Sequence, residues 1–328
     1  MSLNRKLALF IIAATVLPLL LVGLFVVRTA EDALRARILE AQVQTVTAEA
    51  EAVARFVEDR TSALQRASAA FDVSAATPAE LAGAAQLLYR SDESVAVVAL
   101  LDDQGALLAP PAFVAPTDEA GDLARHPRAS EATAERLVRV VPRERAAAEG
   151  AGAVVLSSAY GAPERGDTAL AVALPVRGPG EGLLLYAAEI SLGALSVRAA
   201  RAGGRVSVID AEGRVVAAGD STRLTGPDAL WAKLGGCPGV AAATTTATPA
   251  GVVLAASAPV PLEGLGWTVL ASLPESEAFA PVRRMRLTLG GAILGVVTLL
   301  LAASALFVRQ VRRGLGAVLQ GAEAYASG

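Results

Sequence analysis

The sequence predicts an α+β fold, in which a long N-terminal helix and two tandem antiparallel-sheet units lie between two transmembrane helices. Two uncharged runs near the ends of the chain are each long enough to cross a bilayer, which takes roughly 20 apolar residues. A segment without glycine or proline follows the first run, and an internal repeat lies between the runs. The runs predict the membrane helices, the segment predicts the long helix, and the repeat predicts the two sheet units.

The second uncharged run, Leu289 to Val308, has only Thr298 and Ser304 as polar side chains. Hydrocarbon accepts only backbone whose hydrogen bonds are all internal, so we expect a transmembrane helix at 287–308. The hydrophobic content of 53% fits a membrane protein, because a soluble chain of this composition would expose large apolar patches.

The first uncharged run, Leu7 to Val27, follows Arg5 and Lys6. Its apolar core is longer than the roughly 7–15 residues of a cleavable signal peptide, so we interpret 1–28 as an N-terminal tail with an uncleaved anchor. The two basic residues favour a cytoplasmic N-terminus. We therefore expect a multi-pass protein in which residues 28–286 lie outside the cytoplasm.

Charge and composition exclude several classes of function. A net charge of -3 and a pI near 5.5 give no basic surface for nucleic acid. Cys237 is the only cysteine and His126 the only histidine, so neither an internal disulfide, a zinc site nor a histidine-based catalytic triad is expected. For a hydrolase only an acid pair such as Glu164 and Asp167 would be available. We expect no enzymatic activity, no catalytic residues, no metal and no cofactor, although these counts do not exclude a calcium site made of carboxylates alone.

The segment 29–75 is predicted to be a long helix outside the membrane. Apolar residues recur in a seven-residue pattern with one shift of phase, at Val46, Val53, Val57, Leu64 and Phe71. This stripe can pack on the chain's own domain or on a second copy of the chain, and the sequence leaves both possibilities open.

A short helix is expected after the long one. Thr77 precedes Pro78, and Glu80 stands three residues after the threonine. Threonine at the N-cap and proline at the first helical position are typical of a helix start, and we expect this helix to run to about Tyr89.

The internal repeat has two parts. LLDDQGALLA at 100–109 matches VIDAEGRVVA at 208–217, and each copy reads as a strand, a D-x-x-G turn and a return strand. A Pro-Val pair with a glycine before a last strand recurs at 175–182 and at 259–266. Two matches in the same order predict two copies of one unit, which we place at 76–196 and 197–286.

The first copy is longer than the second. The first pair of matches is offset by 108 residues and the second pair by 84, so the first copy carries 24 more residues between its hairpins. This surplus lies within Pro110 to Thr168, and long loops on a rigid sheet often carry binding sites. After the second copy, Pro274 to Glu277 is expected to begin a helix that continues into the second span.

The two spans, the long helix and the two PAS-like copies resemble the double Cache sensor domain of bacterial chemoreceptors and sensor histidine kinases. The tail GWTVLASLPESEAFAPVRRMR at 266–286 is similar to the way that family leaves its membrane-proximal unit. The resemblance covers about 29–328. It implies a receptor in the bacterial cytoplasmic (inner) membrane, with signal transduction to a chemotaxis or two-component output.

The end of the chain, 309–328, resembles the first helix of a HAMP linker. The matching residues are RGLGAV at 313–318 with Ala322, Tyr325, Ala326 and Gly328, although Gly314 stands where proline is usual. Leu315, Val318, Ala322 and Tyr325 are spaced as a helical seam, which predicts a homodimer. A cytoplasmic output domain or partner is implied.

The amino-acid-binding branch of the double Cache family has a tyrosine two residues before an aspartate, and a further aspartate before the last strand ends in I-S-L. Tyr160 matches that tyrosine, but Ala162 occupies the first aspartate position. Glu189 matches the second aspartate conservatively. With one amine-binding carboxylate missing, the match makes an α-amino acid ligand doubtful.

The same branch has an R-x-W-Y cluster. Arg143 matches the arginine, but Arg145 and Ala146 stand where the aromatic residues would be. We therefore expect a small organic acid or another anion, bound in the first copy between its sheet and the segment from Arg143 to Asp167. The predicted ligand-binding residues are Arg143, Arg145, Tyr160, Asp167 and Glu189. Each also has an ordinary interpretation as a surface charge or as sheet packing.

The predicted function is the sensory input module of a transmembrane receptor. It would bind a small molecule outside the cytoplasmic membrane and pass the signal through the second span to a HAMP linker. The alternative is a membrane-anchored tether or assembly protein with a degenerate Cache domain that binds nothing.

Overall fold

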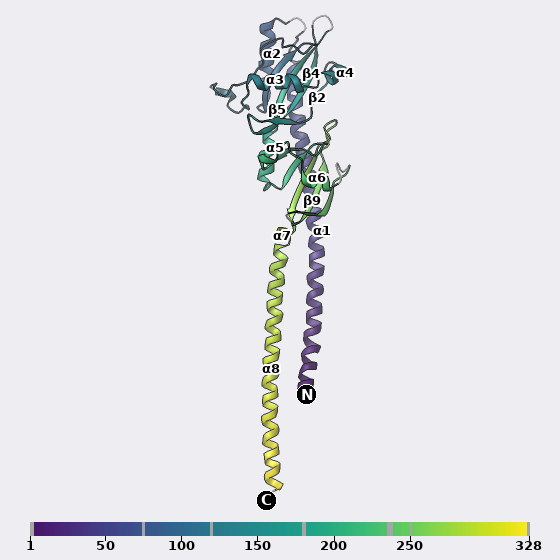
Figure 1. The fold of residues 1–328 in the computed structure, drawn as a ribbon, viewed down its shortest axis with the longest axis vertical. Helices are drawn as coiled ribbons and strands as arrows, with labels where there is room; N and C mark the ends of the chain where they lie inside the picture. The colour runs from purple at the N-terminus through teal and green to yellow at the C-terminus, as the bar shows by residue number, and fades with distance from the viewer. Residues whose placement is uncertain are drawn as a thin grey trace. The chain divides into compact units, whose positions relative to one another are not determined.

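The computed structural model describes residues 3–73, 76–118, 121–178, 182–234, 239–249 and 251–326. The chain forms two compact units. One unit, Leu39–Pro274, holds two five-stranded antiparallel sheets with their helices (Figure 1). The other consists of Met1–Ile38 together with Glu275–Gly328 and is helical where it is described.

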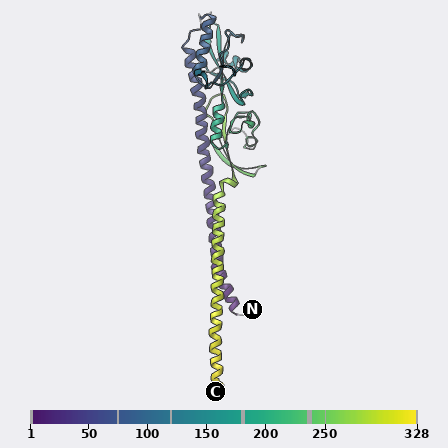
Figure 2. The same ribbon diagram turned by 90° about the vertical axis from the view of Figure 1, so that its left-hand side faces the viewer.

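Helix α1 (Leu3–Ala69) is one continuous helix, in which the predicted first span and the predicted long helix join. From residue 39 onward it runs beside both sheets (Figure 2). Val46, Val53 and Val57 are buried against the second sheet, and Leu64 is buried against the first. The seven-residue stripe therefore packs on the chain's own domain, which was one of the two possibilities that the sequence left open.

The first sheet contains β1 (Val95–Leu101), β2 (Val155–Leu156), β3 (Tyr160–Ala162), β4 (Asp167–Arg177) and β5 (Leu183–Ser191). Its order is β1-β5-β4-β2, and β3 also pairs with β4. Helix α2 (Pro78–Arg90) covers one face together with α1. The predicted cap of α2 is confirmed, because the Thr77 and Glu80 side chains and backbones form a capping box.

The other face of the first sheet is covered by α3 (Glu131–Val140) and α4 (Arg143–Glu149), with a short 3-10 turn η1 (Gly121–Leu123) before them. Leu137 and Ala146 from these helices are fully buried, in a core that also includes Ala99, Ala171 and Ala187 from the strands. Small residues on the strands let the helices approach closely. Helices α3 and α4 lie within the surplus that the sequence placed between residues 110 and 168.

The second sheet has the order β7-β6-β10-β9-β8. Its strands are β6 (Val206–Ile209), β7 (Val215–Ala218), β8 (Ala242–Thr248), β9 (Gly251–Pro259) and β10 (Thr268–Pro274). The helical elements beside it are α5 (Gly193–Arg201), η3 (Ser221–Arg223) and α6 (Ala229–Lys233). Strands β6, β10 and β9 correspond to β1, β5 and β4, so the repeat predicted from the sequence is a repeat of topology.

The two D-x-x-G turns have the same hydrogen bonds. Gly105 donates to the carbonyl of Asp102 at 3.1 Å, and Gly213 donates to that of Asp210 at 3.1 Å. Both glycines have positive φ, 86° and 83°, which side chains disfavour. The predicted return strand of the first copy is reduced to two isolated bridges, at Leu107 and at Ala112. Pro110 and Pro111 lie between the bridges and have no N–H to donate to a ladder.

In the helical unit formed by Met1–Ile38 and Glu275–Gly328, α7 (Glu275–Ala278) is followed by α8 (Ala280–Ala326). The helix expected from Pro274 onward is therefore interrupted at Phe279. Arg35 pairs with Glu275 at 2.5 Å, and Arg286 pairs with Glu31. These ion pairs join α1 to α7 and α8 within this unit.

Among the described residues one helical segment, Ala280–Ala303, is long and apolar enough to cross a membrane. The first predicted span, Leu7 to Val27, lies in α1, but most of its side chains are outside the described ones. It stays a prediction. The same holds for the HAMP-like seam, because α8 is described there by its backbone alone.

Candidate ligand-binding site

The site lies at one end of the face that the first sheet turns toward α3. Glu189 on β5 shares this face with Leu185 and Ala187, because side chains alternate along a strand. In the ladder, Ala171 pairs with Glu189 and Ala169 pairs with Ser191. Tyr160 on β3 pairs with Ala169. Strand pairing thus places a tyrosine and a carboxylate on one face within reach of each other.

Glu189 has no exposed surface and accepts hydrogen bonds from three side chains. The Tyr160 hydroxyl donates to Oε2 at 2.7 Å, and Arg165 donates to Oε1 at 2.8 Å. Arg136 lies 3.5 Å from Oε2. Burial and the neighbouring Glu189 carboxylate raise the pKa of Tyr160 well above its usual range. Tyr160 is therefore a proton donor at any physiological pH.

Arg165 comes from the turn between β3 and β4, residues 163–166. Arg165 and Gly166 both donate backbone N–H bonds to the Ala162 carbonyl at 3.0 Å, and Gly166 closes the turn at a φ of 67°. The Arg165 Nε donates to Asp167 at 3.1 Å, while its Nη2 bonds Glu189. Only 9% of the Arg165 side chain is exposed. This arginine therefore lies beneath its own turn, between two carboxylates.

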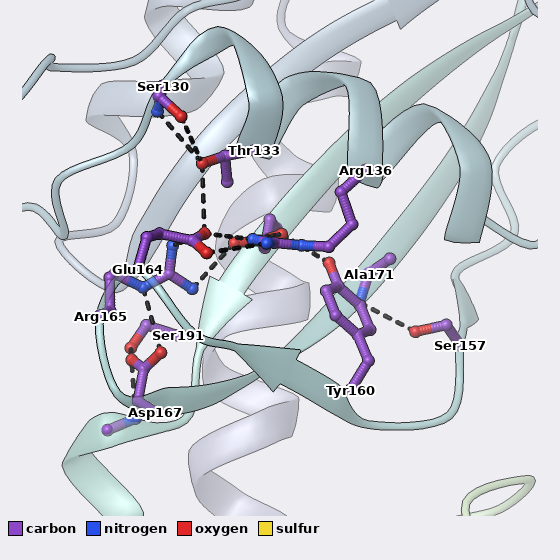
Figure 3. A network of polar contacts seen from close by, with 12 residues as sticks. Ser130, Thr133, Arg136, Ser157, Tyr160, Glu164, Arg165, Asp167, Ala171 and Ser191 are labelled. Atoms are coloured by element: carbon purple, nitrogen blue, oxygen red, sulfur yellow. Dashed lines mark hydrogen bonds and ion pairs between the residues drawn. The ribbon is translucent and has the colours of Figure 1, made fainter.

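Glu164 on the same turn faces α3 (Figure 3). Arg136 donates to Glu164 Oε2 at 2.8 Å and makes a second, shorter contact with Oε1. Thr133 donates to Oε1 at 3.2 Å. Thr133 and Arg136 are three residues apart on α3 and so share one helix face. The hydrogen bonds from Arg136 hold the pKa of Glu164 at about 2.

Asp167 completes the group, because the Ser191 hydroxyl donates to its Oδ2. We refer to six residues as the acid–arginine cluster: Arg136, Tyr160, Glu164, Arg165, Asp167 and Glu189. Two arginines against three carboxylates leave one net negative charge. The acid pair Glu164 and Asp167, considered above for hydrolysis, is thus held in ion pairs with arginines.

Three of the five predicted site residues, Tyr160, Asp167 and Glu189, come together in this cluster. Arg143 lies elsewhere and donates to the Gln104 carbonyl at 2.9 Å, where its guanidinium covers Gly105. Arg145 donates to the Leu156 carbonyl at 3.3 Å. It borders a cavity of about 410 Å³ that Ser157, Asp210 and Trp267 also line. The two arginines expected to bind an anion thus occupy two other places.

The sequence analysis did not predict Arg136 and Arg165 as members of this cluster. Pro163 to Gly166 has the composition of a tight turn, which would have placed Arg165 next to the strand that carries Tyr160. The sequence around Arg136 gives little indication that this arginine joins the cluster, because its position there depends on how α3 lies on the sheet.

No protein-family model and no curated protein sequence matches this chain. Solved structures match it by fold. The ligand-binding domain of the Pseudomonas aeruginosa PAO1 amino acid chemoreceptor PctC in complex with GABA aligns over 70% of this chain and 96% of its own, with 18% identity and a TM-score of 0.51.

Two other ligand-binding or extracellular domains align similarly. That of the Campylobacter jejuni chemoreceptor Tlp3 in complex with L-valine aligns over 75% of this chain and 96% of its own, with 13% identity and a TM-score of 0.54. The extracellular domain of the putative histidine kinase soHK1S-Z6 aligns over 77% of this chain and 99% of its own, with 17% identity and a TM-score of 0.52. The fold is therefore a double Cache fold, and at these identities the likeness concerns the fold.

Proposed function

We propose that this chain is the sensory input module of a transmembrane receptor and that it binds a small molecule at the acid–arginine cluster. The observation that carries the proposal is the burial of Glu189 among Tyr160, Arg136 and Arg165 on a sheet face. Buried charges cost free energy that a purely apolar core avoids, and such groups concentrate at functional sites. The shared double Cache fold supports the same assignment.

The ligand that we propose carries a protonated amine, as amino acids do. The acid–arginine cluster has one net negative charge, which favours a cationic group over an anion. The similar domains of PctC and Tlp3 hold GABA and L-valine, which both carry an ammonium group. This proposal replaces the organic acid expected from the sequence, because Arg143 and Arg145 lie outside the cluster.

Transmission would use the hairpin formed by β3 and β4. The hairpin carries Tyr160, Glu164, Arg165 and Asp167, and it also contacts the second sheet. A Cβ atom at Gly161 would lie 3.2 Å from the Thr225 methyl group. Strand β10 of the second sheet ends at Pro274 and α7 begins at the next residue, so no linker separates this sheet from the helix that leads to the candidate span.

For the topology we propose two spans, at Leu7–Val27 and at 287–308, in the bacterial cytoplasmic membrane, with residues 28–286 outside. Residues 309–328 would begin a HAMP linker and pair with a second copy. Cysteines introduced at Leu315 or Val318 should then crosslink between copies in membranes, once Cys237, which lies outside the described residues, has been replaced. Absence of crosslinks would contradict the dimer but not the binding site.

A tether with a degenerate Cache domain is the second candidate. It is favoured by the packing of Leu137, Val141 and Ala146 onto the face of the first sheet that carries the acid–arginine cluster. These apolar side chains fill space that a ligand would need. Ligand binding separates the two candidates.

The test is a thermal-shift screen of the full chain in detergent against amino acids, GABA, simple amines and organic acids. A ligand at 100 times its Kd should add about 2.7 kcal/mol of stability. A hit that carries an amine and that Glu189→Gln abolishes would support the proposed receptor. A screen without saturable shifts would favour the tether.

A further inference from the structure

Glu189, Glu164 and Tyr160 together form a seat for a cation. Two carboxylates supply acceptor oxygens, and the Tyr160 ring lies beside them. The Cζ atom of Arg136 is 5.7 Å from the centre of that ring, a distance at which a guanidinium is attracted to an aromatic face. The guanidinium of Arg136 therefore lies among two carboxylates and an aromatic ring, which are the groups that would bind a free cation.

Arg136 and Arg165 are held in different ways. Arg165 is 9% exposed and is fixed by Glu189 and by Asp167 on its own hairpin. Arg136 is 18% exposed and comes from α3, a separate element. Its buried Nε has no hydrogen-bond partner in the described part of the chain, a feature that it shares with the Nη1 of Arg165. Leaving this donor unpaired costs free energy, so Arg136 fills the seat less well than a fitted ligand could.

We propose that the guanidinium of Arg136 occupies this cation seat when no ligand is bound. A free ligand must displace this guanidinium with a cationic group of its own. Arg136 is then a specificity-determining residue, because neutral molecules and simple anions cannot displace its guanidinium from the two carboxylates. The inference rests on the proposed function for the physiological ligand. The existence of the seat can be tested without that ligand.

Displacement of Arg136 would also break the ion pair that joins Glu164 to α3 and leave the Thr133 hydrogen bond as the remaining contact. This carboxylate lies on the β3–β4 turn, and Arg136 and Thr133 connect it to α3. Loss of this ion pair would weaken the connection between α3 and the hairpin that contacts the second sheet. Exchange of one cation for another would thus alter the element that joins the two sheets.

The experiment removes the tethered guanidinium and supplies a free one. Arg136→Ala in the full chain in detergent should have a lower Tm than the wild type, because Glu164 and Glu189 each lose one charged partner. Methylguanidinium at millimolar concentration should then raise the Tm of Arg136→Ala saturably, by about 2–4 °C. The wild type, whose seat is filled, should show no such rise.

Two controls define specificity. Arg214→Ala also removes a partner from a buried carboxylate, that of Asp210, but Arg214 is 47% exposed and its place is open to solvent. It should show no saturable shift. Tetramethylammonium, a cation without N–H donors, should not rescue Arg136→Ala.

An absence of saturable rescue in Arg136→Ala would overturn the proposal, as would equal shifts in the wild type or in Arg214→Ala. If Arg136→Ala does not fold alone, recovery during purification in methylguanidinium supports the proposal and failure to recover there overturns it. Failure of the proposed function gives a different result. In that case no compound shifts the Tm of the wild type in the ligand screen, while methylguanidinium still stabilises Arg136→Ala.

Discussion

Thr168 on β4 donates its hydroxyl proton to the backbone carbonyl of Val216 on β7, and this hydrogen bond joins the first sheet to the second. Thr168 directly follows Asp167, a member of the acid–arginine cluster. Leu170, two residues further along β4, is buried in the core of the second sheet. One strand therefore carries part of the proposed binding site and part of the contact between the two sheets.

We expect Thr168→Val to lower the free energy of unfolding by about 1–3 kcal/mol, because the Val216 carbonyl loses a buried partner. The change can be measured as a lower Tm of the full chain in detergent. Thr245→Val on β8 is the matched control, since Thr245 is exposed, and it should leave the Tm nearly unchanged. Equal effects of the two substitutions would show that the hydrogen bond to Val216 contributes nothing.

Tyr160→Phe should destabilise the chain by about 1–3 kcal/mol, because the buried Glu189 carboxylate loses a donor. Tyr186→Phe provides the comparison within the same sheet. The Tyr186 hydroxyl is buried without a hydrogen-bond partner in the described structure, so its removal should be neutral or stabilising. Thermal unfolding of both variants tests the prediction, and a larger loss in Tyr186→Phe would contradict it.

The two-copy architecture could be predicted from the sequence because its signals are local. A D-x-x-G turn requires a glycine at positive φ, and Gly105 and Gly213 mark both copies. The first return strand was not predicted correctly, because the effect of Pro110 and Pro111 on the ladder outweighs the apolar pattern.

The cluster could be predicted only in part. Tyr160 and Glu189 were found because they match the motif of the amino-acid-binding branch of the double Cache family, and in the structure the Tyr160 hydroxyl lies 2.7 Å from a carboxylate oxygen of Glu189. Their arginine partners depend on the tertiary structure. Arg136 reaches the cluster because Leu137 packs α3 onto the sheet, which no local pattern around Arg136 records. Arg143 had a local match to a motif, but its guanidinium lies on the Asp102–Gly105 turn.

The pKa of Glu164 should be about 2 in the folded chain, because Arg136 donates hydrogen bonds to its carboxylate. A lowered pKa stabilises the folded state above the ordinary value near pH 4.5, and this contribution is lost as the pH falls toward 2. Side-chain NMR of the carboxyl groups can follow the titration. In Arg136→Met the pKa of Glu164 should rise toward its ordinary value.

Glu80 serves as the internal control for this titration. Its pKa is lowered by hydrogen bonds with Thr77 at the start of α2, and Arg136 takes no part in them. It should titrate identically in the wild type and in Arg136→Met. A Glu164 pKa that stays the same in both chains would contradict the ion pair with Arg136.

Leu299→Arg should impair membrane insertion of α8, because arginine near the centre of a membrane helix costs about 2.5–3.5 kcal/mol. Leu299 lies near the middle of the proposed span 287–308, and 71% of its surface is exposed. An insertion assay of the segment 275–326 in a host membrane protein measures the effect without the first predicted span. Leu287→Arg is the control, since an arginine near the end of the apolar run can extend its charge to the interface. Equal insertion of both variants would show that Leu299 does not face the lipid at the centre of a membrane.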